Sequence, residues 1–419
     1  MSATCHVVGA GLAGLSAAVS LARDGARVRL SEATGAAGGR CRSYHDPQFG
    51  AVIDNGNHLV LSGNRGVMDY LRTIGALDRL DGPDEAAIAF ADARSGERWT
   101  LRLNDGALPW WILDPRRRTP GTRAVDHLPL LKLLRGRDGR TIGEVLPGRG
   151  PLWERLLEPF LLAVLNTPPE RASLELAAAV VRETLAEGGR ACRPRIASPT
   201  LAAAFVDPAV AWLQGRGAEL AFHRRLKRLE TSGGRATGLA FGEEVTPLGP
   251  EDVVILAVPP WTAQELVPGL EAPDAFEPIV NGHFARAAPA GTPMMTGVIG
   301  GTAQWIFALP GRLSVTVSAA DALIELEREE IAPRLWADVA KVMGLPPQLP
   351  AWQIVKEKRA TFAATPAQDA RRPGAATPLA NLFLAGDWTD TGLPATIEGA
   401  LRSGTRAAAL ARGPKRRAA

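Results

Sequence analysis

Three glycines near the start of the chain have the spacing of a phosphate-binding turn. They are Gly9, Gly11 and Gly14, and an acidic residue, Glu32, follows roughly 20 positions later. In such a turn the first glycine permits a tight bend, the second lets a pyrophosphate approach the backbone, and the third lets a helix pack closely on a strand. The carboxylate accepts hydrogen bonds from ribose hydroxyls. The pattern predicts a binding site for an adenine dinucleotide.

The elements that must position this turn are a strand, a helix and a second strand. Residues 4–8 form a short apolar run, and apolar residues then recur at helical spacing until Gly25 ends the helix. Residues 27–31 form the second strand, which places Glu32 at its carboxyl end. Because a carboxylate there would repel a 2′-phosphate, the pattern leaves NAD or FAD as the ligand.

A second glycine-rich turn separates these two cofactors. The sequence GAAGGR at residues 35–40 follows Glu32 closely and ends in Arg40. An arginine beside glycines suits a long, doubly phosphorylated cofactor that is held from its other side. A solvated arginine in a glycine-rich loop is the alternative on position alone. The two turns together favour FAD.

Further cofactor-like segments lie in the middle and at the end of the chain. Residues 252–260 predict a buried parallel strand, and residues 382–385 predict another, followed by Gly386-Asp387 and a helix that begins near residues 394–396. We therefore expect an α/β fold in which a Rossmann-like FAD-binding domain of the glutathione-reductase type is interleaved with a mixed α+β substrate domain. The expected FAD-binding parts are residues 1–85, 206–265 and 351–419, and the expected substrate parts are 86–205 and 266–350.

Composition argues against several other classes. The formal net charge of +4 at pH 7 is too small to predict nucleic-acid binding. Three separated cysteines and six unclustered histidines predict neither a disulfide framework nor a metal site. No apolar run approaches the ~18 residues of a spanning helix, and no secretion signal is evident, so we expect a cytoplasmic protein.

Several longer segments resemble one protein family. EATGAAGGR, VVILAVPP and LFLAGDWTDTG are similar to segments of the FAD-dependent amine oxidase and phytoene desaturase superfamily. More narrowly, five segments resemble those of bacterial hydroxysqualene dehydroxylases. They are DNGNHLVL (54–61), FLLAVLNTPPERAS (160–173), PIVNGHF (278–284), KEKRATFAATPAQ (356–368) and GLPATIEGALRSG (392–404). The resemblance implies non-covalent FAD and an isoprenoid substrate, hydroxysqualene. Reduced flavin would convert it to squalene with loss of water in squalene and hopanoid synthesis, and an unidentified partner would reduce the flavin.

The resemblance also implies which residues hold FAD. Glu32 and the first glycine turn would hold the ADP half, Arg40 would approach the pyrophosphate or ribose, and Asp387 would bond the ribityl chain. The backbone of Thr396 and Ile397, at the start of the last helix, would face flavin O2. The complete implied set is Gly9, Gly11, Leu12, Ala13, Gly14, Glu32, Ala33, Gly39, Arg40, Asn57, His58, Gly386, Asp387, Thr396, Ile397 and Leu226, which replaces the valine that is usual beside adenine.

The implied reaction needs an acid near the substrate hydroxyl, apolar walls and exclusion of water. His58 is the first candidate for the proton donor, because an imidazole protonates near neutral pH. The alternative role of His58 is to orient the flavin or the backbone. Glu398, on the last helix, is the second candidate, and Asp54 is expected to brace its loop.

Three other functions compete with this one. An amine oxidase would orient its substrate with aromatic rings, but the chain has only two tyrosines, Tyr44 and Tyr70, and Trp388 supplies a single ring near the last helix. A phytoene-type desaturase shares the fold and the substrate class, so product analysis must separate it. A non-catalytic prenyl-lipid carrier has no need of the flavin-contacting segments that this chain retains.

Residues 107–140 predict a peripheral contact with the inner face of the cytoplasmic membrane and an entrance for a water-insoluble substrate. The adjacent Trp110 and Trp111 suit an interface, and eight basic residues outnumber three acidic ones. An arginine-rich loop over two core tryptophans is the alternative. The charged residues are Arg116, Arg117, Arg118, Arg123, Lys132, Arg135, Arg137 and Arg140 against Asp114, Asp126 and Asp138; the leucines expected to add apolar contact are Leu128, Leu130, Leu131, Leu133 and Leu134.

Overall fold

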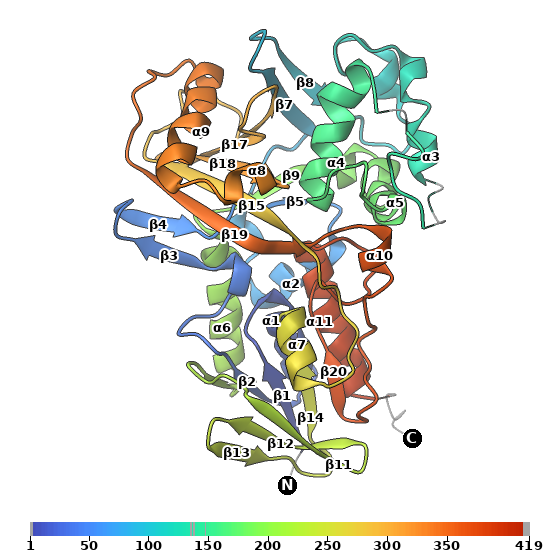
Figure 1. Cartoon of the computed structure of the whole chain (residues 1–419), viewed down its shortest axis with the longest axis vertical. Coiled ribbons are helices and arrows are strands. Elements are labelled where there is room, and N and C mark those ends of the chain that lie inside the picture. The colour runs from blue at the N-terminus through green and yellow to red at the C-terminus, as the bar shows by residue number, and fades with distance from the viewer. Residues whose placement is uncertain (1–2, 135, 137–138, 147, 414–419) are drawn as a thin grey trace.

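The computed structural model describes residues 3–134, 136, 139–146 and 148–413. Two lobes are stacked along the long axis of the molecule (Figure 1). A five-stranded sheet fills the lower lobe and a seven-stranded sheet spans the upper lobe. Strands β15 (Phe276–Phe284) and β19 (Trp352–Phe362) of the upper sheet run across the junction between the lobes. Both sheets contain segments that are distant in the sequence, so the lobes interleave along the chain.

The lower sheet is parallel throughout. Its order is β10 (Glu219–Ala221), β2 (Arg27–Ser31), β1 (Thr4–Val8), β14 (Val253–Leu256) and β20 (Leu382–Leu384). Every residue of β1 is buried, as expected for a central strand that is covered on both faces. The carboxyl ends of these strands share the edge that faces the upper lobe, where open α/β sheets bind ligands. The expected Rossmann-like architecture is confirmed.

Helices and a small sheet cover the lower sheet. Helices α1 (Leu12–Arg23) and α11 (Ile397–Ala411) pack side by side, and α6 (Asp207–Gln214) packs on α1. Gly404 permits the close approach of the first two, because a Cβ there would lie 2.1 Å from the Ala13 carbonyl oxygen. An antiparallel sheet of β11 (Arg228–Ser232), β12 (Arg235–Phe241) and β13 (Glu244–Pro247) lies at the bottom of the lobe.

The upper sheet has two chemically different faces. Its order is β19, β15, β18 (Arg312–Ser318), β17 (Trp305–Leu309), β16 (Met295–Ile299), β7 (Ala87–Asp92) and β8 (Arg98–Arg102). One face is apolar and packs on α9 (Arg328–Met343) and α8 (Asp321–Ile324), through residues such as Val280 and Val315. Side chains alternate along a strand, so Asn281 and Thr316 lie on the opposite face, which meets the lower lobe. The sheet therefore places polar groups at the junction.

Of the remaining elements, α2 (Arg65–Ile74) and α7 (Pro260–Leu266) pack in the lower lobe, and the others lie at the junction or in the upper lobe. Among the described residues, no helix is long and apolar enough to cross a membrane. The elements at the junction or in the upper lobe are α3 (Leu130–Leu134), α4 (Glu158–Leu165), α5 (Leu174–Glu183), α10 (Pro366–Asp369), β3 (Ser43–Asp46), β4 (Ala51–Asp54), β5 (Leu59–Leu61), β6 (Leu80–Asp81) and β9 (Pro194–Ala197).

The sheets divide the chain differently from two of the expected domain boundaries. β19 was expected in the last FAD-binding part, but it pairs with β15 and belongs to the upper sheet. Leu201 and Phe205 were expected in the substrate part, but they are buried in the core of the lower lobe together with Leu15. Burial and strand pairing decide both cases, and neither has a signal in local composition.

Candidate active site

The turn between β1 and α1 is built by close backbone contacts. Gly9 has φ +104°, and a Cβ there would lie 2.3 Å from the Ala257 carbonyl oxygen. A Cβ on Gly14 would lie 1.9 Å from the Gly9 carbonyl oxygen. By contrast, apart from its chain neighbours, no atom of the described part of the chain lies within 4 Å of the equivalent position on Gly11, which precedes the first turn of α1. Open space at the N-terminus of a helix is what an approaching pyrophosphate requires.

Glu32 lies at the end of β2, beside this turn. Its Oε2 accepts a 2.8 Å hydrogen bond from the Ala10 N–H, and its Oε1 accepts from the N–H and the hydroxyl of Thr34, both at 2.8 Å. The Glu32 carbonyl accepts from the Arg224 N–H at 2.7 Å, which brings the segment that contains Leu226 to the same edge. The carboxylate is fixed where the two glycine turns meet, and lone pairs remain for ribose hydroxyls.

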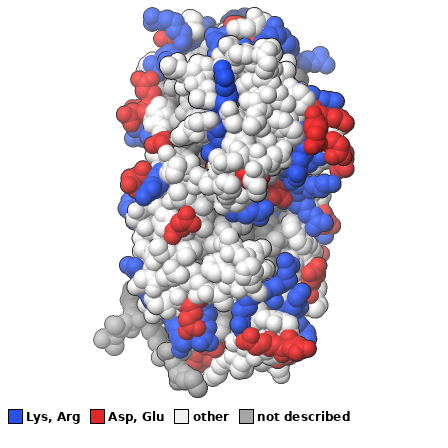
Figure 2. Space-filling view, turned by 90° about the vertical axis from the view of Figure 1, so that its left-hand side faces the viewer, with Lys and Arg blue, Asp and Glu red and all other residues white. Residues whose placement is uncertain are grey.

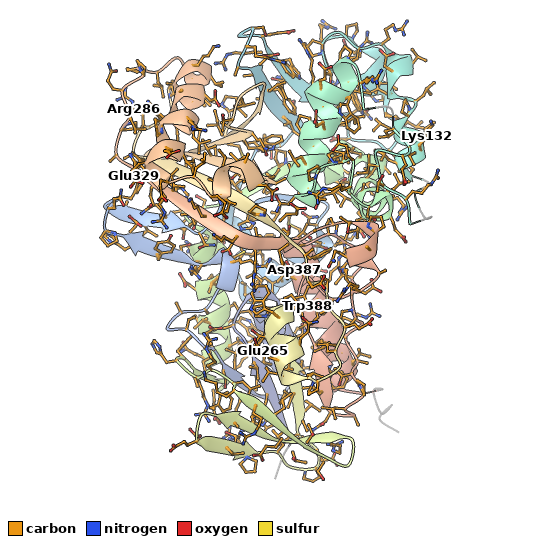
Figure 3. The ribbon with its side chains drawn as sticks, in the orientation of Figure 1. Lys132, Glu265, Arg286, Glu329, Asp387 and Trp388 are labelled. Atoms are coloured by element: carbon orange, nitrogen blue, oxygen red, sulfur yellow. The ribbon has the colours of Figure 1, made fainter. Side chains whose placement is uncertain are left out.

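Arg40 and Asp387 bring the second turn and the last strand of the lower sheet together. Arg40 Nη2 donates to Asp387 Oδ1 at 2.6 Å, and Nη1 donates to the Ala360 carbonyl oxygen of β19. Figure 3 shows Asp387 and Trp388 next to each other at the junction of the lobes. Residues that are almost a chain length apart in the sequence therefore meet in one polar site.

The loop that carries Asp387 is held by a buried arginine that the sequence analysis missed. The Arg372 guanidinium has no exposed surface; it pairs with Asp369 at 2.9 Å and donates to the Thr391 hydroxyl at 3.1 Å. It also donates to the backbone carbonyls of Asp387 and Thr389. One side chain thus fixes the loop on several sides. Nothing in the surrounding sequence distinguishes this arginine from the many others.

The start of α11 points its positive end at the junction. Thr396 is the N-cap, and its hydroxyl accepts a 3.0 Å hydrogen bond from the Gly399 N–H. Ile397 is buried at the first helical position. Backbone N–H groups at a helix start are free to donate, and the helix dipole favours negative charge there. The pair predicted to face flavin O2 therefore has the required backbone arrangement.

Asn57 connects the lower lobe to the polar face of the upper sheet. Its Nδ2 donates to Thr316 Oγ1 at 3.1 Å and to the Val315 carbonyl oxygen at 3.3 Å. Thr316 in turn donates to Asn281 Oδ1 at 2.8 Å. Because a carbonyl can only accept, these partners fix the orientation of the Asn57 amide. Asn57 Oδ1 is left buried without a hydrogen-bond partner in the described chain, and such an acceptor suits a ligand hydroxyl or N–H.

His58 lies next to this pair and is uncharged at neutral pH. Removal from water, and secondarily the positive charge of Arg40, lower the pKa of His58 to about 4. The lowered pKa therefore disfavours His58 as a protonated acid near pH 7, and its role in catalysis stays a prediction. A neutral imidazole still offers one donor and one acceptor, so His58 is placed to hydrogen-bond a ligand.

Further buried polar groups support the segment that contains Asn57 and His58. Asp54 accepts from the Ser43 hydroxyl at 2.5 Å and the Leu201 N–H at 2.9 Å, and it pairs with Arg312 at 3.2 Å. The Asp54 carbonyl oxygen lies 3.1 Å from His283 Nε2. Burial, and then Arg312, lower the pKa of His283 to about 4. Asp54 braces its loop, as the sequence predicted, and does not face a free ligand position.

Comparison with known proteins identifies the family. The model of the flavin containing amine oxidoreductase family matches residues 12–411. The hydroxysqualene dehydroxylase of Rhodopseudomonas palustris is 53% identical over 411 residues, which cover 98% of each chain. That of Zymomonas mobilis is 50% identical over 98% of this chain and 99% of its own. The chain belongs to the hydroxysqualene dehydroxylase family.

More distant proteins place this family in its wider fold. A solved structure of putrescine oxidase bound to putrescine has a TM-score of 0.71 and 16% identity, with 98% of each chain covered, which shows the shared fold alone. A probable zeta-carotene desaturase of Synechococcus elongatus is 25% identical over 96% of this chain and 97% of its own. The desaturase alternative therefore has weaker support than hydroxysqualene dehydroxylase.

One predicted catalytic residue of this hydroxysqualene dehydroxylase family member is structural. Glu398 Oε1 accepts from the Gly66 N–H at 2.9 Å, and Oε2 accepts from the Val67 N–H at 2.8 Å, so the carboxylate caps the start of α2. Arg402 Nε donates to the same carboxylate at 2.6 Å. These contacts favour a capping role for Glu398 over that of a proton donor.

The other predicted cofactor residues gather along one edge. Gly39 lies over Gly11, with a Cβ position 3.3 Å from the Gly11 Cα, and the turn residue Ala33 follows Glu32. Leu12 and Ala13 are buried at the start of α1. Gly386 must lack a side chain, because a Cβ would lie 2.4 Å from Trp388 Nε1. Their contacts with a cofactor remain predictions.

Proposed function

We propose that this chain binds FAD non-covalently and reductively dehydroxylates hydroxysqualene to squalene. The observation that carries the proposal is full-length identity of about half to proteins named hydroxysqualene dehydroxylase. In the overall reaction the allylic C–O bond breaks, a C–H bond forms from a hydride, and a proton joins the departing hydroxide as water. The substrate is an almost purely apolar chain with a single hydroxyl, so the site needs apolar walls and few polar groups.

The residues of the lower lobe fit FAD. We assign the open space at Gly11 to the pyrophosphate, Glu32 to the adenosine ribose and the Leu226 backbone to the adenine. Asp387 would bind the ribityl chain, and the backbone at Thr396 would bind the flavin ring. When bound and reduced, FAD supplies the hydride. Purified protein should be yellow and release its flavin on acid precipitation; a colourless protein that FAD does not reconstitute would refute the assignment.

The junction supplies the few polar groups that the substrate needs. We assign Asn57 Oδ1 as the hydrogen-bond acceptor for the substrate hydroxyl, because this oxygen is buried and has no partner among the described residues. The Nδ2 group of the same amide is already held by Thr316 and Val315. Neutral His58 lies beside Asn57 and hydrogen-bonds the same hydroxyl. An uncharged pair avoids placing a further cation at a buried position, where its desolvation is costly. Both residues bind and orient the hydroxyl, and the proton that completes the water enters from outside this pair.

Two aromatic rings near the junction are held by the chain itself, which favours an isoprenoid over an amine as the substrate. Trp388 is buried, and its Nε1 donates to the Val258 carbonyl oxygen at 3.0 Å. Tyr70 is also buried and donates to the Phe205 carbonyl oxygen. Neither ring is available to orient an amine. A non-catalytic carrier would have no need of the loop at Asp387 that Arg372 holds. A desaturase would form an oxidised polyene, so product analysis distinguishes it from a dehydroxylase.

The decisive experiment supplies hydroxysqualene to the dithionite-reduced holoprotein under anaerobic conditions. We expect squalene, and in deuterated water we expect deuterium at the carbon that carried oxygen, because the flavin N5 hydrogen exchanges with solvent. Oxidised protein without reductant should form no squalene. An oxidised polyene, or squalene without deuterium at that carbon, would contradict the proposal.

We also propose that the protein works at the inner face of the cytoplasmic membrane and takes electrons from an unidentified flavin reductant. Hydroxysqualene and squalene dissolve in lipid rather than in water, so substrate and product must cross between bilayer and site. A peripheral contact meets this need without a spanning helix. Turnover with substrate in vesicles, compared with substrate in detergent micelles, measures whether the transfer step depends on such a contact.

A further inference from the structure

Exposed apolar side chains are concentrated in one segment of the upper lobe. Among the described residues, eleven large apolar side chains are exposed, and six of them lie between residues 108 and 131. Two are almost bare, with 81% of Leu108 and 68% of Leu113 accessible to solvent. Single exposed apolar residues are ordinary, but a contiguous group marks a contact surface. The six are Leu108, Trp110, Leu113, Val125, Leu128 and Leu131, and we refer to them as the apolar ridge.

The local fold holds the ridge outward. Trp110 is 52% exposed, whereas its neighbour Trp111 is 5% exposed and packs edge-on against the buried His127 at 5.4 Å. Leu133 is likewise buried while Leu131 is exposed. The expected pair of interfacial tryptophans is therefore half correct, because one ring anchors the segment and the other points away from the protein.

Several backbone groups of the segment are already hydrogen-bonded to side chains, which favours insertion into an apolar phase. Asn104 Nδ2 donates to the Leu108 carbonyl oxygen at 2.9 Å, and Asn104 Oδ1 accepts from the Trp111 N–H at 3.2 Å. Arg118 donates to the carbonyl oxygens of Ile112 at 3.0 Å and Thr122 at 2.8 Å. A polar group left unpaired in hydrocarbon costs several kcal/mol, so these contacts remove a main penalty of insertion.

Positive charge surrounds the ridge. Between residues 107 and 134 five basic side chains stand against two acidic ones, Asp114 and Asp126. Arg116 and Arg123 are 90% and 80% exposed. They pair with the two acidic residues at 3.4 and 3.3 Å, which leaves Arg117, Arg118 and Lys132 as the excess positive charge. The Arg117 guanidinium lies 4.7 Å from the Trp110 ring centre. Figure 3 shows Lys132 at the outer edge of the upper lobe. Arg135, Arg137 and Asp138 lie outside the described residues.

The positive charge around the apolar ridge also indicates what kind of partner the ridge binds. Two copies of this chain that met ridge to ridge would bring the same cations together, which opposes a symmetric dimer. An anionic lipid surface complements the cations, and its acyl region takes the leucines, with Trp110 at the depth of the headgroups. By contrast, the opposite side of the molecule carries both signs of charge, mostly toward its edges (Figure 2).

We propose that the apolar ridge and its cations dock the protein on an anionic bilayer and form the entrance for the substrate. The entrance role rests on the proposed function, whereas the docking role does not. One apolar cluster contains Trp111 and Leu133 beneath the ridge and also Trp388 at the candidate active site. The ridge is therefore supported by the same apolar core that reaches the candidate active site, as an entrance for an apolar chain requires.

Flotation of the full-length holoprotein with vesicles tests the docking role. We expect the protein to float with phosphatidylcholine vesicles that contain phosphatidylglycerol, and to bind at least tenfold more weakly to phosphatidylcholine alone. Leu108→Ser/Leu113→Ser should lower the partition coefficient at least tenfold, and Arg116→Gln/Arg123→Gln should lower it roughly tenfold. The matched control Leu77→Ser/Leu349→Ser removes two exposed leucines elsewhere and should bind like wild type.

Three results would overturn the docking role. The first is a wild-type protein that does not float. The second is a Leu108→Ser/Leu113→Ser variant, here called the ridge variant, that floats like wild type. The third is a wild-type dimer that the ridge variant converts to a monomer. For the entrance role, the ratio of turnover in vesicles to turnover in detergent micelles should fall at least fivefold in the ridge variant. An unchanged ratio refutes the entrance, whereas absence of squalene from wild type in both media refutes the proposed function and leaves the flotation result standing.

Discussion

The glycine turn after β1 and the polar junction under β15 belong to one candidate site, but they are built in opposite ways. In the turn, backbone touches backbone: Gly9 and Gly14 leave no room for a Cβ, and no side chain supplies chemistry. In the junction, side chains from β4, β15 and β18 hydrogen-bond to one another, and an imidazole that titrates near neutral pH in water is held neutral.

The difference determines what each region is sensitive to. Steric contacts do not depend on pH, so the turn should respond to added atoms and not to protons. The junction contains buried ionisable groups whose charged forms are disfavoured by the low polarity around them. It should respond to charge and to pH, and only weakly to small changes in volume.

The largest effect should come from filling the turn. Gly14→Ala places a Cβ 1.9 Å from the Gly9 carbonyl oxygen, so strand and helix must separate. Alanine gains ~1 kcal/mol of helix propensity, but we expect a net loss of more than ~4 kcal/mol in the free energy of unfolding. Chemical denaturation of the apoprotein measures this loss.

The matched control is Gly11→Ala in the same turn. Apart from its chain neighbours, no atom of the described residues lies within 4 Å of the Gly11 Cβ position, so the apoprotein should unfold like wild type while FAD binds at least tenfold more weakly. If both variants lost stability equally, the division between packing and cofactor glycines in this turn would be wrong.

The sequence was sufficient for the turn because its logic is local. Residues 4–32 contain the strand, the glycines, the helix, the second strand and the acid in one continuous stretch, and each has its own pattern. The same holds for the last strand and the capped start of α11 at Thr396. Backbone-built sites leave regular spacings, and spacings can be recognised from one sequence.

The junction was not predictable in this way. Asn281 and Thr316 become partners of Asn57 only when β15 and β18 pair and turn the same face toward the lower lobe. The capping contacts of Glu398 were unpredictable for a related reason, because the helix start that it caps belongs to a segment more than 300 residues away. Contacts across the fold have no fixed spacing, so residue type alone suggested chemistry where the structure uses the carboxylate as a cap.

The second-largest effect should be a pH dependence of stability that comes from the junction. The pKa of His283 is about 4 when folded, against 6.5 for a free imidazole, so the unfolded chain binds more protons between these values. The free energy of unfolding should therefore be highest above pH 6.5 and fall as the pH drops toward 4, by ~3 kcal/mol from this residue. His58 shifts in the same direction and adds to the fall.

Denaturation between pH 4 and 7.5 measures this dependence. His283→Gln should lose stability at pH 7 and show a shallower pH dependence than wild type, because glutamine does not titrate. Gly11→Ala, in the turn, should keep the full wild-type dependence. A variant at His283 that retained the wild-type slope would show that the junction histidine does not couple folding to protons.

The smallest effect should come from Glu398, which caps the start of α2 and is assigned to neither ligand site. Glu398→Gln keeps the shape of the side chain while it removes the charge at the start of α2 and turns one acceptor into a donor that faces an N–H group. We expect a loss of ~1–2 kcal/mol in the free energy of unfolding and a kcat within twofold of wild type.

His58→Ala should show the reverse, with little change in stability and slower turnover, because His58 makes no hydrogen bond to other described residues and is assigned to the substrate hydroxyl. If Glu398→Gln instead lowered kcat a hundredfold at unchanged stability, the carboxylate would be the proton donor after all, and the boundary between the junction and its supporting helices would have to be redrawn.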